Sequence, residues 1–280
     1  MTLQAITEQI RQKKSFLCIG LDTDVSKLPP HLSDRKNRIF EFNRQIIDAT
    51  QEYAIACKPN IAFYECLGAD GWNQLEMTVQ YIRDRYPDLF LIADAKRGDI
   101  GNTSKKYAET FFKRFDFDAI TVAPYMGSDS VIPFLQYSGK WVILLALTSN
   151  PGAEDFQFLP GPAHQPLFET VITKSLAWGN AENTMYVVGA TKASLLAKIR
   201  EIVPDHFLLI PGIGAQGGDL AEVARYGLNG NCGLIVNSSR AILFADSTER
   251  FAEVAAIKAK EVQIQMHGLL TEAGFTGIQE

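Results

Sequence analysis

The chain has 280 residues, of which 46% are hydrophobic and 21% charged, and this composition excludes a disordered or low-complexity protein. The formal net charge of −5 gives no wide basic surface, so we expect no nucleic acid as partner. No apolar run approaches the roughly 18 residues of a membrane span, and the amino-terminal apolar stretch is too short for a signal peptide. Four cysteines without CxxC spacing fit a reducing compartment, so we expect no membrane association and a cytoplasmic location.

Short apolar runs alternate along the chain with segments of helical periodicity. The runs are nearly continuously hydrophobic, which is typical of parallel strands covered on both faces. We expect strands at Phe16–Gly20, Ala54–Lys58, Leu89–Asp94, Ala119–Val122, Trp141–Leu147, Met185–Gly189, Phe207–Ile210 and Cys232–Asn237. We expect helices at Arg38–Tyr53, Leu75–Arg85, Ser104–Phe115, Leu167–Trp178, Ser194–Ile202, Leu220–Tyr226 and Glu249–Met266.

The alternation predicts an α/β protein with a single (β/α)₈ TIM-barrel domain over residues 1–280. Eight strand–helix units without a composition break favour a closed barrel over an open sheet or two domains. A leading helix at about residues 1–15 and a tail after about residue 267 flank the barrel. The longest irregular stretch, Thr148–Pro166, follows the fifth strand, at the end where barrels carry their chemistry.

Charged residues cluster at the carboxyl ends of the expected strands. Asp94 and Lys96 are two apart on the third strand, so they face the same side, and Lys58 ends the neighbouring strand. Asp99 follows in the loop before the next helix. Neighbouring carboxylates keep a lysine protonated, so this array can act as an acid or stabilise a carbanion. A salt-bridged rim that only caps the barrel is the structural alternative.

The seventh strand leads into Gly212-x-Gly214-x-x-Gly217, which has the form of a dinucleotide fingerprint. That fingerprint requires an acidic residue about 20 positions later, where this chain has Asn237-Ser-Ser-Arg240. A phosphate site fits better, because glycines let backbone N–H groups approach the oxygens and Arg240 supplies a bidentate cation. A glycine-rich turn beside a surface arginine is the alternative.

Metal chemistry has little support in the sequence. The four histidines are scattered, without HExxH or paired spacing, at His31, His164, His206 and His267. We therefore expect no metal ligands.

The stretch from Asp94 to Ser104, which reads DAKRGDIGNTS, resembles the central motif of the orotidine 5′-phosphate decarboxylase family, in its longer bacterial branch (type 2). The resemblance covers nearly the whole barrel, although its other motifs are individually weak. It includes Gly20-Leu-Asp22, Lys58-Pro-Asn, Ser149-Asn-Pro-Gly-Ala, Pro211-Gly-Ile-Gly-Ala-Gln216 and Ser239-Arg240.

The resemblance implies decarboxylation of orotidine 5′-phosphate to UMP and CO₂, the last step of UMP synthesis, without metal or organic cofactor. It makes Lys96 the proton donor to C6 and places Asp94 beside the departing carboxylate. It also implies a homodimer with shared active sites. It further implies that Lys58, Asp99 and Asp22 complete the charged network and contact the ribose, and that Ser149 faces the pyrimidine edge. At the phosphate it implies Gln216 and Arg240, together with the loop glycines Gly214 and Gly217. It also implies that Asp99, Ile100 and Thr103 reach into the partner's site.

Two other functions stay open. Magnesium-dependent sugar-phosphate decarboxylases and aldolases of the same superfamily share the Asp-x-Lys-x-x-Asp pattern but use a glutamate where this chain has Lys58, which cannot ligate a cation while protonated. A non-catalytic barrel that binds a nucleotide monophosphate is the other alternative, although all four members of the charged array are present. Ser239 stands where many relatives have glycine.

Overall fold

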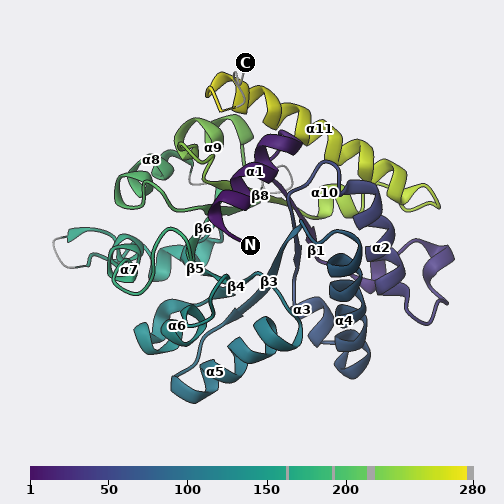
Figure 1. The fold of residues 1–280 in the computed structure, drawn as a ribbon, viewed down its shortest axis with the longest axis horizontal. Coiled ribbons are helices and arrows are strands. Elements are labelled where there is room, and N and C mark those ends of the chain that lie inside the picture. The colour runs from purple at the N-terminus through teal and green to yellow at the C-terminus, as the bar shows by residue number, and fades with distance from the viewer. Residues whose placement is uncertain (162–163, 191–192, 213–217, 276–280) are drawn as a thin grey trace.

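Strands β1 to β8 form a closed barrel in which each strand pairs in parallel with the next and β8 pairs with β1 (Figure 1). The structure is a computed structural model that describes residues 1–280 except 162–163, 191–192, 213–217 and 276–280. The fold class predicted from the sequence is therefore confirmed. The strands are β1 (Leu17–Leu21), β2 (Ala56–Pro59), β3 (Phe90–Arg97), β4 (Ala119–Val122), β5 (Trp141–Leu147), β6 (Thr184–Val188), β7 (Leu208–Pro211) and β8 (Leu234–Ser238).

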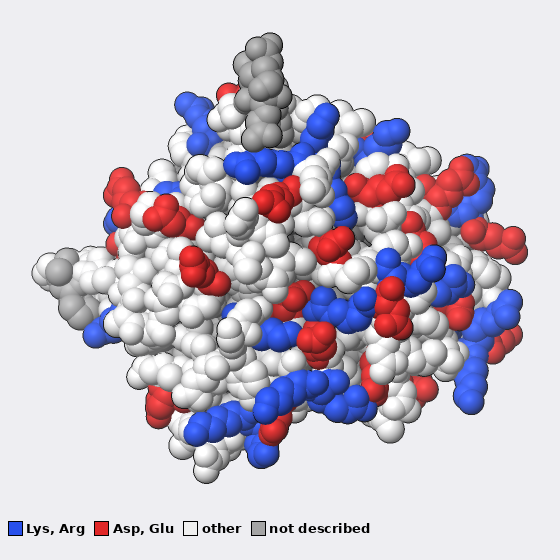
Figure 2. Space-filling view, in the orientation of Figure 1, with Lys and Arg blue, Asp and Glu red and all other residues white. Residues whose placement is uncertain are grey.

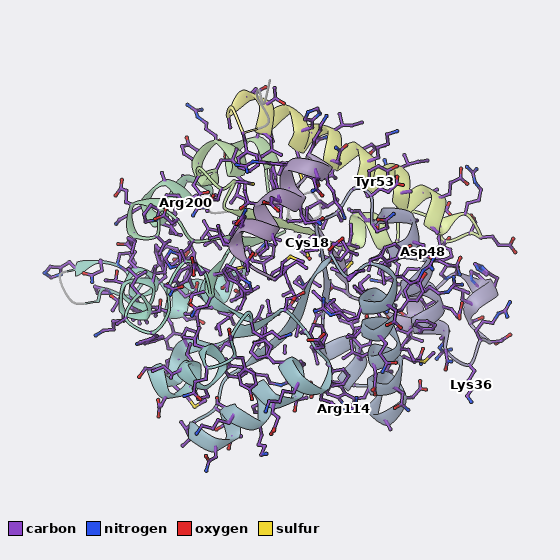
Figure 3. The ribbon with its side chains drawn as sticks, viewed as in Figure 1. Cys18, Lys36, Asp48, Tyr53, Arg114 and Arg200 are labelled. Atoms are coloured by element: carbon purple, nitrogen blue, oxygen red, sulfur yellow. The ribbon has the colours of Figure 1, made fainter. Side chains whose placement is uncertain are left out.

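The strands are buried because helices cover the outside of the barrel while side chains fill its inside, which explains their near-continuous hydrophobicity. Cys18 on β1 illustrates this, since its thiol is fully buried (Figure 3). The helices are α1 (Leu3–Lys13), α2 (Arg38–Thr50), α3 (Ala62–Glu65), α4 (Gly68–Arg85), α5 (Gly101–Glu109), α6 (Ser128–Leu135), α7 (Leu167–Ser175), α8 (Ala193–Ile202), α9 (Leu220–Gly227), α10 (Arg240–Leu243) and α11 (Phe251–Glu272). Shorter turns are η1 (Val25–Lys27), η2 (Pro30–Leu32), the π-helical η3 (Thr110–Arg114), η4 (Pro124–Met126) and η5 (Pro151–Asp155).

Several helices differ from the sequence-based expectation, among them the short α3 and α10, which were not expected. Helix α6 was not expected, because it is short and contains Pro133, which weakens the helical pattern. Helix α4 begins at Gly68, whereas the sequence predicted a start near Leu75. The glycines of its first turn are poor helix formers, so the sequence pattern did not reveal this start. Gly71 is required there, since a Cβ atom would lie 1.9 Å from the Tyr64 carbonyl oxygen. Helix α11 extends past Met266 to Glu272, so part of the expected tail is helical.

Helix α1 crosses the amino-terminal end of the barrel, the end that faces the viewer in Figure 1. The indole Nε1 of Trp141, at the start of β5, donates a 2.8 Å hydrogen bond to the Met1 carbonyl oxygen. The amino terminus lies 3.5 Å from Asp118 Oδ1, just before β4. Because α1 covers this end, the opposite, carboxyl-terminal end of the strands is left for a site.

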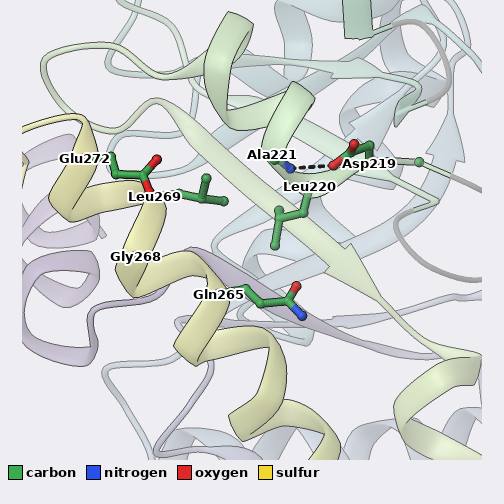
Figure 4. A pocket seen from close by; sticks show the side chains of 8 residues that line it. Asp219, Leu220, Ala221, Gln265, Gly268, Leu269 and Glu272 are labelled. Carbon is green, nitrogen blue, oxygen red and sulfur yellow. Dashed lines mark hydrogen bonds between the residues drawn. The ribbon is translucent and has the colours of Figure 1, made fainter.

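Acidic and basic side chains are interspersed over most of the face seen in Figure 2, as the balanced composition suggests. A pocket of about 470 Å³ lies on the outside of the barrel between the start of α9 and the carboxyl-terminal half of α11 (Figure 4). Asp219 caps α9 there by accepting a 2.8 Å hydrogen bond from the Ala221 N–H. Within the described residues, no helix is both long and apolar enough to cross a membrane.

Arg200 and His206 lie together just before β7, where the Arg200 guanidinium also donates to the His206 carbonyl oxygen. The Arg200 guanidinium, labelled in Figure 3, donates to the carbonyl oxygens of Gly227 and Gly233, each at 2.7 Å. His206 is 7% exposed, and neither of its ring nitrogens has a hydrogen-bond partner among the described residues. Burial, and then the neighbouring Arg200 charge, lower the pKa of His206 below its ordinary value of 6.5.

The lowered pKa of His206 predicts acid sensitivity of the fold. The unfolded chain binds a proton at His206 more readily, so the folded state loses stability as the pH falls below about 6.5. Because the two states differ by at most one proton at this residue, the unfolding free energy falls by at most about 1.4 kcal/mol per pH unit. We expect His206→Gln to flatten the dependence of the unfolding free energy on pH between pH 7 and 5, measured by urea denaturation. An equally steep dependence in the variant would contradict this assignment.

Candidate active site

A cavity of about 350 Å³ opens at the carboxyl-terminal end of the barrel. Its polar wall comes from the ends of β2, β3 and β4 and the loop after β5, and its apolar wall from β5, β6 and β7. The lining residues are Lys58, Asp94, Lys96, Thr121, Leu145, Thr148, Ser149, Asn150, Val187, Leu209 and Pro211. The cavity thus brings together residues from six strands or their following loops, which is typical of barrel active sites.

Asp94 on β3 is the centre of the polar wall. Its Oδ2 lies 2.8 Å from Lys58 Nζ and its Oδ1 lies 2.5 Å from Lys96 Nζ, so each carboxylate oxygen has its own ammonium partner. Lys58 is 4% exposed and Asp94 9%, whereas about half of the Lys96 side chain is open to solvent. The predicted convergence of these three side chains is thus observed, with Lys96 on the open side.

The electrostatics of this cluster favour its charged form. Burial by itself raises the pKa of Asp94, but the ammonium groups of Lys58 and Lys96 outweigh it and hold that pKa well below its ordinary value. Burial likewise lowers the pKa of Lys58, yet the charges of Asp94 and then Asp22 bring the net shift upward. At neutral pH the buried pair therefore consists of a carboxylate and an ammonium.

Asp22 follows β1 at the same end of the barrel. Its Oδ1 is buried and has no hydrogen-bond partner among the described residues. Gly20, two residues earlier, permits the close approach of β8, because a Cβ atom there would lie 1.9 Å from Ser239 Oγ. The Ser239 hydroxyl accepts a hydrogen bond from Asn237 Nδ2 at 3.1 Å. Serine at position 239 is thus matched by glycine at position 20.

Asp99 does not join the Lys58–Asp94–Lys96 cluster through any contact in the described part of the chain. It lies in the turn between β3 and α5, where its Oδ1 accepts a 2.7 Å hydrogen bond from the Ile100 N–H. The Ser104 hydroxyl, in the first turn of α5, donates to the Asp99 carbonyl oxygen. Ile100 is 57% exposed and Thr103 is also exposed. The sequence predicted an array of four charged residues, but the structure brings three of them together within one chain. The reason is that β3 ends at Arg97 and the chain turns before Asp99.

Ser149 lies on the rim of the cavity, in the loop after β5. Gln157 holds this loop, because its Oε1 accepts from the Thr148 N–H and its Nε2 donates to the Thr148 hydroxyl, both at 2.8 Å. At Gly189 the chain passes so close that a Cβ atom would lie 2.8 Å from the Ser149 backbone. These contacts fix the start of the long Thr148–Pro166 loop against the barrel.

The residues expected at a phosphate are only partly described. Gly214, Gln216 and Gly217 lie outside the described residues. Arg240 begins α10, and its side chain is exposed rather than part of the cavity lining. Its role toward a phosphate stays a prediction.

Thr121, Thr148 and Asn150 are polar lining residues that were not among the predicted site residues, and Thr121 is the one in contact with Asp94. It lies inside the apolar run of β4, is 1% exposed, and its hydroxyl donates to Asp94 Oδ1 at 3.1 Å. A single hydroxyl residue within an apolar strand was the only signal, and such residues are common in strands.

Among the described residues, no three or more histidine, cysteine, aspartate or glutamate side chains gather in a way that could hold a metal ion. At the end of β2, Lys58 forms its ion pair with Asp94. The charged groups of the described cavity thus suit an anionic ligand better than a cation.

Comparison with known proteins agrees with this geometry. The family model described as "Orotidine 5'-phosphate decarboxylase / HUMPS family" matches residues 15–255. The chain is 60% identical to an orotidine 5′-phosphate decarboxylase of Phocaeicola vulgatus over 97% of this chain and 100% of that protein. It is 61% identical to one of Bacteroides fragilis over 95% and 97%. The solved structure of Leishmania donovani OMP decarboxylase has a TM-score of 0.77 and 34% identity, over 94% of this chain and 99% of that one.

These similarities extend over nearly the full chain and confirm the resemblance inferred from the Asp94–Ser104 motif. They also confirm that the protein is an enzyme of the carboxy-lyase class. The closed barrel and the cavity at its carboxyl-terminal end are consistent with the similarity to these relatives. The chain therefore belongs to the orotidine 5′-phosphate decarboxylase / HUMPS family.

Proposed function

We propose that this enzyme removes the C6 carboxylate of orotidine 5′-phosphate, giving UMP and CO₂ as the last step of de novo UMP synthesis. The observation that carries the proposal is the Lys58–Asp94–Lys96 cluster, which presents a solvent-accessible ammonium beside a buried carboxylate in one cavity. The names and high identity of the relatives support the same substrate.

The proposed reaction breaks the bond between C6 and the carboxylate carbon, so that CO₂ departs and the electron pair stays on C6. The Lys96 ammonium then gives a proton to C6. Because negative charge develops at C6 without a conjugated acceptor, a cation fixed at that position stabilises the transition state more than the substrate. Asp94, held ionised by Lys58, would lie beside the departing carboxylate and repel it before bond cleavage.

The remaining roles concern binding. Asp22 has an unpartnered buried oxygen near Lys58, and this suits a ribose hydroxyl donor. Ser149, which lines the cavity at its rim, is proposed to face the pyrimidine edge. Arg240, together with Gly214, Gln216 and Gly217, is proposed to hold the phosphate, whose binding energy can favour closure over the site.

A homodimer with shared active sites is part of the proposal. Asp99 and Ile100 lie in the turn before α5, and Thr103 lies in the first turn of that helix. No contact among the described residues joins them to their own chain's charged cluster, and two of the three are exposed. A partner's turn can then supply the missing carboxylate.

We also propose that the reaction needs no metal or organic cofactor, since Lys58 occupies the position of the carboxylate ligand in the magnesium-dependent relatives. A cytoplasmic location stays a prediction from the sequence.

The first test of this function is Lys96→Ala. Removal of the proposed proton donor should lower kcat/KM for orotidine 5′-phosphate by about 10³ or more. The fold should persist, because the side chain is half exposed. Turnover is measured by the loss of substrate absorbance and folding by thermal denaturation. Lys260→Ala, at an exposed position of α11, is the matched control and should retain activity. Near-normal turnover of Lys96→Ala would remove Lys96 from this role.

The second test concerns metal dependence. Activity on orotidine 5′-phosphate should be the same with and without EDTA, and added magnesium should not increase it, because no step of the proposed reaction uses a cation other than lysine. Loss of activity in EDTA that magnesium restores would instead favour the sugar-phosphate branch of the superfamily.

The third test addresses the shared site. An Asp99→Ala chain and a Lys96→Ala chain should each be inactive as homodimers. Hybrid dimers would have one site with both residues intact, so a 1:1 mixture should recover about a quarter of the native activity after random exchange. Absence of recovery, with subunit exchange proven by differently tagged chains, would contradict shared sites.

A further inference from the structure

Strand β3 leaves regular pairing with β4 where it carries the charged cluster. Ala93 is paired with Ile120 and Arg97 with Val122, so β3 takes four steps (93 to 97) while β4 takes two (120 to 122). Asp94 and Lys96 both lie in this bulge. Bulges of this kind re-aim side chains next to active sites.

Lys96 has an unusual backbone conformation within the bulge. Its φ is +48°, in the left-handed region that costs a residue with a Cβ atom about 1 kcal/mol or more. Its N–H group donates to the side-chain Oγ1 of Thr121 on β4, at 2.9 Å. An interaction outside the ordinary sheet therefore holds the conformation of the lysine.

Thr121 contacts both active groups through one oxygen atom. Its Oγ1 accepts from the Lys96 N–H and donates its single hydrogen to Asp94 Oδ1 at 3.1 Å, so its donor capacity is fully used. The same Asp94 oxygen accepts from Lys96 Nζ at 2.5 Å. These three bonds close a ring through Thr121 Oγ1, Asp94 Oδ1 and the Lys96 side chain. Thr121 is only 1% exposed, so its hydroxyl depends on these two partners for its hydrogen bonds.

We propose that Thr121 is a positioning residue for the decarboxylation. Its hydroxyl keeps the Lys96 backbone in the left-handed conformation and sets the orientation of the Asp94 carboxylate, so that the ammonium is held where C6 would lie. The catalytic part of this inference rests on the proposed function. The hydrogen bonds of Thr121 do not depend on which reaction the enzyme catalyses. Misplacement of a reacting group by about 1 Å can cost about 10²-fold in rate.

The test compares Thr121→Val with Thr121→Ser. Valine keeps the shape and removes the hydroxyl, while serine keeps the hydroxyl and removes a methyl group. If the hydroxyl positions Lys96, valine should lower kcat about 10- to 100-fold, and serine should recover most of that loss. KM and the dissociation constant of UMP, measured by calorimetry, should change little, because the groups proposed to hold the ribose and phosphate are elsewhere. If Thr121 only fills space in β4, serine should be the more damaging change.

A control separates positioning from stability. Thr50 in α2 is fully buried, and its hydroxyl donates to the Ile46 carbonyl oxygen at 2.7 Å, away from the cavity. Thr50→Val removes a buried hydroxyl of the same kind, so it should affect thermal stability but not kcat. Equal losses of kcat in Thr50→Val and Thr121→Val would overturn the proposal.

Crystal structures of the two Thr121 variants distinguish this inference from the proposed function. We expect Lys96 to leave the positive-φ region in Thr121→Val and to keep it in Thr121→Ser. An unchanged Lys96 and Asp94 in the valine variant would overturn the positioning role, whatever the enzyme's substrate. A native enzyme that does not turn over orotidine 5′-phosphate would overturn the proposed function, while the structural comparison would still decide the role of Thr121.

Discussion

The ion pairs of Asp94 with Lys58 and Lys96 hold the candidate active site together. A carboxylate and a lysine buried as deeply as Asp94 and Lys58 are costly unless each satisfies the other. Removal of one partner leaves an uncompensated buried charge, which typically costs about 3–5 kcal/mol. The cluster is thus tied to stability as well as to chemistry. Lys96 differs, because its side chain is about half exposed. Its ammonium can therefore contact a substrate without leaving a buried charge unpaired.

This arrangement also reconciles the acidic composition with an anionic substrate. A net charge of −5 gives the molecule no long-range attraction for a nucleotide phosphate. Attraction has to be local, where a low-dielectric cavity makes each charge more effective. Lys58 and Lys96 supply two positive charges against the one negative charge of Asp94 in the cavity lining. The apolar side chains of Leu145 and Val187 on the other wall limit solvent around them.

Much of the fold was accessible from local sequence pattern. Parallel strands buried on both faces read as apolar runs, and the rhythm of strand and helix predicted the closed barrel. Helix α6 was not predicted because Pro133 interrupts its pattern, and the start of α4 was not predicted because Gly71 there allows close packing against Tyr64 of α3. These failures share a cause, since residues chosen for packing between elements contradict the propensity of the element itself.

The residues of the charged motif, and the end of the barrel at which they lie, could be predicted from the amino-acid sequence. The two-residue spacing of Asp94 and Lys96, and their position at the end of an apolar run, were sufficient for that. Three features became visible in the folded chain alone: Thr121 joins these residues, Lys96 has a positive φ, and Asp99 makes no contact with its own chain's cluster among the described residues. The reason is physical: a bulge depends on the register between two strands, and register is a relation between distant segments that neither segment encodes alone.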